Sequence, residues 1–230
     1  MKIVSTLLFC LTITIFSFAD EVIKKDLEPY KKLIITGQMT AEITEGEEFK
    51  VTAFVDGEDL EADKLKFEYD DEELTISYDG KLLKELEIHL ELEAPRLSNL
   101  EAANRAEIKM KNPIGDDYEA LIFNSRSGGK ILAKFNHVPW VKAEIKRGGS
   151  IRMIGSTALL EMDITTGGSI GAVRTDADRV NASISMGGEI ICKAEKALHA
   201  KIRGGGSIHY KGDPEILEED IKLGGKLKKL

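Results

Sequence analysis

Apolar and polar residues alternate with a period of two on both sides of a glycine pair that recurs six times between residues 128 and 225. The pairs follow one another at steps of 20, 19, 20, 18 and 19 residues. They are Gly128-Gly129, Gly148-Gly149, Gly167-Gly168, Gly187-Gly188, Gly205-Gly206 and Gly224-Gly225. A fixed period of this size predicts a repeat architecture, in which each repeat is one unit of a stack.

Each repeat is numbered here from its first glycine as position zero. Positions −7, −5, −3, +3 and +5 are mostly apolar, and +3 is filled by Ile131, Ile151, Ile170, Ile190, Ile208 and Leu227. The intervening positions −6, −4 and −2 are mostly polar or charged. This alternation predicts two strands per repeat, each with one buried and one exposed face.

The same pattern distinguishes hairpins from coils. A two-residue Gly-Gly hairpin turn would set position −3 opposite +4 on one face of a sheet. Position −3 is apolar, whereas +4 is often polar, as at Arg152, His209 and Lys228. Because a slip of one residue moves a whole strand's apolar set to the other face, hairpins fit poorly. We predict an all-β fold, a right-handed parallel β-helix-like solenoid with coils of about 19 residues and glycine pairs at the corners. An antiparallel β-sandwich or meander is the alternative.

Three segments are expected along the chain. Residues 1–19 predict a signal peptide, since Lys2 precedes an apolar run to Phe18 and Ala19 is a small residue before a cleavage point at Asp20. An uncleaved anchor is the alternative, although the run is shorter than the ~20 residues of a typical spanning helix. Residues 20–29 are expected to be a lead-in, and residues 30–230 a single domain without a linker. We therefore expect an exported protein of the periplasm or cell surface.

Composition narrows the function. The chain has 32 Lys and Arg against 40 Asp and Glu, which disfavours nucleic acid as a partner because duplex affinity rests on basic residues. Outside residues 1–19 the only cysteine is Cys192, at an inner +5 position, so no internal disulfide is expected. No nucleophile motif, phosphate loop, cofactor fingerprint or metal-ligand spacing occurs, so neither a cofactor nor a metal is expected.

The candidate ligand face lies on the outer positions. Glu144 and Asp163 share position −4 and are expected to be ladder neighbours, an arrangement that suits acid–base work on a polysaccharide or Ca²⁺ binding. Position −2 carries Arg126, Lys146 and Arg203, which suit an acidic glycan or a lipid headgroup. The plainer interpretation is a solvated face, because Asn124, Ser183 and Lys201 fill the other −4 positions.

The last repeat differs from the others. It carries Glu219 and Lys229 at inner positions that are apolar elsewhere. Charged edges of this kind discourage end-to-end stacking.

Motifs in three places along the chain indicate a family. The first is an opening pair of strands, Leu33-Ile34-Ile35-Thr36-Gly37 and Ala41-Glu42-Ile43-Thr44-Glu45-Gly46. The second is Thr166-Gly167-Gly168-Ser169-Ile170, and the third is Tyr210-Lys211-Gly212-Asp213-Pro214. In this order the mature chain resembles the auto-transporter adhesin "head GIN domain" family of exported bacterial proteins. The family pattern more often reads Ser-Gly-x-Gly, and here its earlier glycine survives only at Gly204. The resemblance implies a β-helix-like solenoid and a cell-envelope location, and little about activity.

Three functions remain open from the sequence. The first is a non-enzymatic, adhesin-like binding or structural protein that presents an extended β-face to a glycan or an envelope protein. The second is a β-helix polysaccharide lyase or hydrolase centred on Glu144, Lys146 and Asp163. The third is an envelope protein that stacks with itself as a homo-oligomer.

Overall fold

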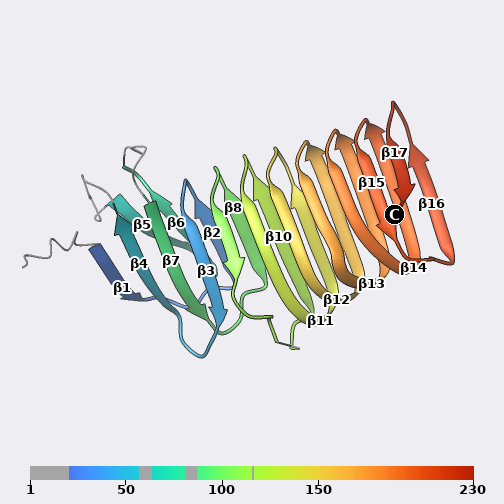
Figure 1. Ribbon diagram of the computed structural model, residues 1–230. Coiled ribbons are helices and arrows are strands. Elements are labelled where there is room, and N and C mark those ends of the chain that lie inside the picture. Colours follow the sequence, from blue (N-terminus) through green and yellow to red (C-terminus); the bar gives the residue numbers. More distant parts are fainter. Residues whose placement is uncertain (1–20, 57–63, 81–86, 116) are drawn as a thin grey trace, which may run out of the picture.

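The computed structural model describes residues 21–56, 64–80, 87–115 and 117–230, so the predicted signal peptide of residues 1–19 lies outside the described residues. The described strands form one continuous sheet that is wound into an elongated stack (Figure 1). The strands are β1 (Glu21–Asp26), β2 (Lys32–Thr36), β3 (Thr40–Glu45), β4 (Lys50–Asp56), β5 (Leu65–Asp70), β6 (Glu73–Tyr78), β7 (Glu87–Ala94), β8 (Asn99–Ala103), β9 (Glu107–Met110), β10 (Ala120–Arg126), β11 (Lys130–Ile145), β12 (Ser150–Thr166), β13 (Ser169–Met186), β14 (Glu189–Gly204), β15 (Ser207–Lys211), β16 (Ile216–Ile221) and β17 (Lys226–Lys229).

The C-terminal half is a parallel β-solenoid of about six turns, as the glycine period predicted. Each coil consists of the strand before a glycine corner and the strand after it. Coils stack in register, so that Ile131, Ile151, Ile170, Ile190, Ile208 and Leu227 form one ladder. Opposite the corners, β11 to β14 continue around the bend as single long strands, where the pairing register shifts.

The N-terminal part departs from a purely parallel coil. The parallel coils continue, and β2–β3 lies between β6–β7 on one side and β8–β9 on the other. Beyond them, β4 pairs antiparallel with β7, β1 pairs antiparallel with β4, and β5 pairs antiparallel with β6. The expected lead-in of residues 20–29 is therefore wrong for Glu21–Asp26, because β1 extends the sheet at this end.

The interior is made of the predicted inner ladders. Positions −7, −5, −3, +3 and +5 are buried in the five coils whose glycine pairs begin at residues 128 to 205. Each fully buried Val, Leu, Ile or Met side chain of these ladders stabilises the coil by about 1.5–3 kcal/mol. Cys192 is fully buried in the +5 ladder, and burial raises the pKa of its thiol to about 12. Among the six coils with glycine pairs, the last one opens to solvent, and Glu219 and Lys229 are exposed there at inner positions.

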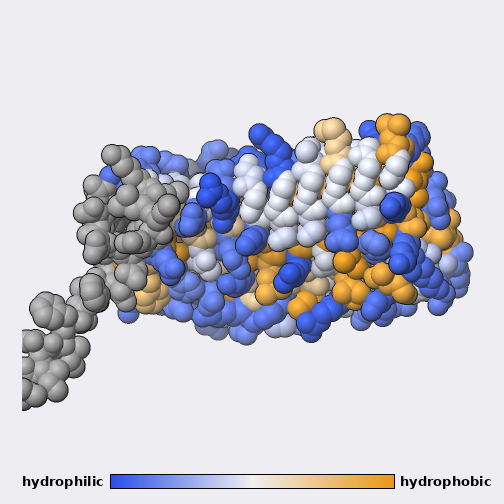
Figure 2. All heavy atoms as spheres, turned by 45° about the horizontal axis from the view of Figure 1, so that its top comes forward, coloured by the Kyte–Doolittle hydropathy of each residue, from blue (hydrophilic) through white to orange (hydrophobic). Residues whose placement is uncertain are grey.

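The corners depend on glycine because successive corners stack backbone on backbone. A Cβ placed on Gly168 would lie 2.9 Å from the carbonyl oxygen of Gly149, and the next coil repeats this contact. Figure 2 shows a pale band of intermediate hydropathy, the colour that glycine takes on this scale, along one edge of the solenoid.

The prediction that both glycines of every pair form the corner is wrong at the first and last pairs. There Ser127 and Leu223 take the first left-handed position, with φ of 52° and 46°, and Gly128 and Gly224 take the second. In the other four pairs both glycines have positive φ. The corner therefore has two left-handed residues in each coil, and its place shifts by one residue where a non-glycine residue tolerates φ near +50°.

Candidate functional site

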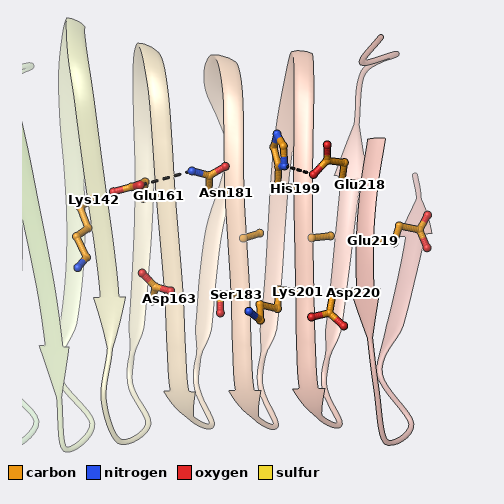
Figure 3. Close-up of a pocket in the computed structure, with 12 residues that line it drawn as sticks. Lys142, Glu161, Asp163, Asn181, Ser183, His199, Lys201, Glu218, Glu219 and Asp220 are labelled. Atoms are coloured by element: carbon orange, nitrogen blue, oxygen red, sulfur yellow. Dashed lines mark hydrogen bonds and ion pairs between the residues drawn. The ribbon is translucent and has the colours of Figure 1, made fainter. Parts of the chain in front are cut away.

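A shallow groove of about 500 Å³ lies on the outer face of the solenoid, over the strands that precede the glycine corners (Figure 3). We call it the polar groove. Its lining comes from positions −6, −5 and −4 of successive coils: Lys142, Glu161, Asp163, Asn181, Ala182, Ser183, His199, Ala200, Lys201, Glu218, Glu219 and Asp220. The lining forms continuous rows because in-register stacking sets equal positions of successive coils about 4.8 Å apart.

The side chains of the −6 row are largely paired, with one another or with Trp140 beside the row. The Trp140 Nε1–H donates a hydrogen bond of 2.9 Å to the Glu161 carboxylate, and the Asn181 amide donates one of 3.5 Å to its other oxygen. His199 Nδ1 lies 2.8 Å from a carboxylate oxygen of Glu218. These contacts fix the side chains and leave few of their polar atoms free for a ligand.

The −4 row is different. Asp163, Ser183 and Lys201 are half-buried neighbours on three successive coils, and among the described residues none of them has a side-chain hydrogen bond or ion pair. Burial raises the pKa of Asp163 above its ordinary 3.8. The charge of Lys142 opposes this shift, and those of Glu144 and Glu161 add to it. The row thus offers an acceptor, a hydroxyl and a cationic donor in a line.

A second group of ligand atoms lies on the same kind of outer face near the N-terminal end. Oxygen and nitrogen atoms of Glu42, His89 and Glu91 lie within 4.8 Å of one another, as a metal site requires. The Lys111 ammonium already lies 2.8 Å from Glu42 and 3.2 Å from Glu91, and this contact holds the pKa of Glu42 below its ordinary value. Because the Lys111 ammonium lies where a metal cation would bind, these residues form an ion-pair network on the outer face.

Comparison with known proteins places the fold. The family described as "Putative auto-transporter adhesin, head GIN domain" matches residues 29–214. The chain belongs to this family. No curated protein matches the chain.

Several solved structures share the fold of this chain. A "putative adhesin" from Bacteroides fragilis is 21% identical, with a TM-score of 0.74 over 93% of this chain and 99% of that one. A "putative lipid binding protein" from Parabacteroides distasonis is 19% identical, with a TM-score of 0.70 over 91% of this chain and 96% of that one. A "putative adhesin" from Parabacteroides merdae is 18% identical, with a TM-score of 0.66 over 91% and 95%. At these identities the likeness concerns the fold.

The structure brings together some of the predicted site residues of this head GIN chain. Glu144 and Asp163 are ladder neighbours, and the Lys146 ammonium lies 3.9 Å from a Glu144 oxygen. Arg126 instead pairs with Glu101 at 2.8 Å on the preceding coil. Arg203 is separated from Lys146 by two coils, so the −2 position forms no continuous basic stripe.

Ser183 and Lys201 are not among the candidate residues of the sequence analysis, because their mixed chemistry at position −4 favours a solvated face. In the structure they continue a row from Asp163 along the polar groove. The available signal was their shared position in the repeat, whereas their lack of partners is visible only in three dimensions.

Proposed function

We propose that this chain is an exported, adhesin-like binding protein of the cell envelope, without catalytic activity, that holds a glycan along the polar groove. The observation that carries the proposal is the unpaired −4 row of Asp163, Ser183 and Lys201. Sugar hydroxyls donate to a carboxylate and accept from an ammonium, so a row of both suits a hydroxyl-rich chain that lies along the coils. Membership of an adhesin family supports the same function.

Export rests on the family and on the predicted signal peptide of residues 1–19. The described part of the chain contains no helix with the length and apolar character needed to cross a membrane.

The shape and pairing of the groove favour binding over turnover. It is open along one face, and both carboxylates that flank Asp163 already have partners and are less available as a second catalytic group. Glu161 accepts a hydrogen bond from Trp140, and Glu144 forms ion pairs with Lys142 and Lys146 at 3.7 and 3.9 Å. The net charge of its lining is acidic, which suits a neutral or cationic glycan better than an acidic one.

A glycan-array screen of residues 20–230 tests the proposal, followed by affinity measurements on the glycans that bind. Asp163→Asn and Lys201→Met should each weaken binding about tenfold or more, because a hydrogen bond to a charged group contributes about 1.5–3 kcal/mol. The matched controls Asp117→Asn and Lys130→Met change exposed residues outside the groove and should leave affinity unchanged. Binding that survives both groove substitutions would overturn the site.

The alternative is the polysaccharide lyase or hydrolase centred on Glu144, Lys146 and Asp163. One observation favours it, since a raised carboxyl pKa beside a second carboxylate is what a general acid needs. Turnover of a bound glycan that disappears in both Asp163→Asn and Glu144→Gln would establish this function in place of the first.

A further inference from the structure

The last coil presents two free strand edges. Among the described strands, β16 pairs only with β14 and β17 only with β15. The edges of β16 and β17 that face away from the stack therefore carry backbone N–H and C=O groups without a strand against them. An edge of this kind is a template for pairing with another strand.

The two edges carry opposite charges. Glu218, Glu219 and Asp220 follow one another in β16, and β17 contains Lys226, Lys228 and Lys229. The side chains of Glu219, Lys226 and Lys228 have no hydrogen bond or ion pair within the described part of the chain. If both strands carried charge of the same sign, two copies of this end would repel each other. Here β16 is acidic and β17 is basic, so the end of one copy is complementary to the end of another.

Apolar side chains gather at the same end. The described residues include six large hydrophobic side chains that are exposed, and four of these belong to the last coil or follow it directly. They are Ile216, Leu217, Leu223 and Leu230, with exposed fractions of 52%, 41%, 85% and 55%. Hydrophobic surface is visible towards this end in Figure 2, opposite the grey trace. A partner that covers this end gains apolar burial as well as strand pairing.

We propose that two copies of this chain associate end to end through their last coils, with β16 of each copy antiparallel to β17 of the other. The two-fold axis that achieves this lies parallel to the strands, and it keeps both glycine corners on the same edge. Residues at equal distance from the corner then meet across the axis. Asp220 faces the partner's Lys228, Glu219 faces the partner's Lys229, and Ile221 faces the partner's Leu227.

The other two-fold arrangement is disfavoured by charge. An axis perpendicular to the strands would set β16 against β16 and β17 against β17, so that acids meet acids and lysines meet lysines. Like charges directly opposite one another in a sheet are destabilising. The preferred arrangement has one kind of like-charge contact, between Lys222 and the partner's Lys226 next to the corner, and the two-fold axis repeats it once.

The association also extends the outer face that holds the polar groove. Glu218 and Asp220 line the groove at its open end, and β17 of the partner would continue this face with Lys228. The proposal does not depend on the identity of the groove ligand, because the contact is between two copies of the chain.

Sedimentation velocity of residues 20–230 over a dilution series tests the association. We expect a dimer that dissociates on dilution and weakens at high salt, where exposed charges are screened. Asp220→Lys alone and Lys228→Glu alone should each weaken the dimer on the order of tenfold, since each change occurs twice in a two-fold interface. The control Asp117→Lys, an equal change of charge at an exposed site away from the last coil, should not.

The double variant Asp220→Lys/Lys228→Glu decides the arrangement, because it restores opposite charges only when β16 lies on β17. Its return to the dimer affinity of the unchanged chain supports the proposal, and thermal unfolding checks that each variant is folded. A monomer at every concentration, a dimer that ignores both single substitutions, or a double variant that stays dissociated would each overturn it.

Discussion

At the scale of single residues, the carboxylate of Asp163 lowers the stability of the folded state, and it has no protein partner that would block a ligand. It is half-buried, and neither a hydrogen bond nor an ion pair within the described residues stabilises its charge. Glu161, two residues earlier in the same strand, differs from Asp163 because its carboxylate accepts hydrogen bonds from Trp140 and Asn181. A half-buried carboxylate that has no protein partner, has a raised pKa and lines a groove is a candidate for contact with a ligand.

Asp163→Asn should therefore stabilise the fold while it weakens the proposed glycan binding. The native pKa of Asp163 lies above its ordinary 3.8, so the native state is penalised for carrying the charge. This penalty is fully present above the native pKa and disappears as the pH falls through the native pKa and then below 3.8, where the carboxyl becomes protonated in both states.

Urea titrations of both proteins between pH 3.5 and about pH 7 measure this difference. The midpoint of the variant should exceed that of the unchanged chain near neutral pH, and the two should converge at acid pH. Asp117→Asn is the control. A variant that is less stable at neutral pH would show that Asp163 has a structural partner.

At the scale of the element, the glycine corner has two positions with different demands. Gly187 has a φ of +63°, and a Cβ added there meets nothing within 4 Å. Gly188 has a φ of +113°, and an added Cβ would lie 3.0 Å from both the Gly168 carbonyl oxygen and the Ile164 side chain. The repeat period reveals the corner, but only the stacking of coils reveals which glycine is irreplaceable.

Gly187→Ala and Gly188→Ala form a matched pair that tests this difference. We expect Gly187→Ala to cost about 1–2 kcal/mol, the cost of a left-handed conformation in a residue with a Cβ. Gly188→Ala should cost about 2–4 kcal/mol, because backbone strain adds to the clash with the preceding coil. Chemical denaturation gives both values, and equal losses would contradict the stacked corner.

At the scale of the whole molecule, the stack behaves as a one-dimensional array in which each coil contacts only its neighbours. β13 is paired on both edges along most of its length, with β12 and β14, whereas β16 and β17 are each paired on one edge. The N-terminal end is covered by the antiparallel strands β1, β4 and β5. Stability in such arrays follows from nearest-neighbour interfaces, so the two ends are unequal.

Native-state hydrogen exchange should follow this inequality. We expect the slowest amides in β12 and β13 and the fastest strand amides in β16 and β17, because opening the last coil breaks only one interface. If the last coils associate, higher protein concentration should slow exchange in β16 and β17 and leave β13 unchanged. Uniform exchange along the solenoid would instead indicate that the whole stack opens as one cooperative unit.

The regular coils could be predicted from the sequence because each repeat carries the same apolar pattern within about 19 residues. Inner position +3 repeats an aliphatic residue in every coil, and the structure places that ladder in the core up to Ile208. The N-terminal pairings were less accessible. Glu42 meets Glu91 because β3 pairs with β7, and no periodic signal connects two strands so far apart in the sequence.

The sequence by itself determined the coil length, the inward faces and the parallel stacking, because burial forces apolar residues into a period of two and close backbone approach forces glycine into the corners. Tertiary structure alone decided the antiparallel N-terminal edge, the shift of the first and last corners, and which outer side chains have partners. The physical reason is that outer residues are hydrated in any register, so almost any polar residue is stable at these positions and their pattern does not predict their partners. Only the stacking of one coil on the next leaves Asp163, Ser183 and Lys201 unpaired in a single row.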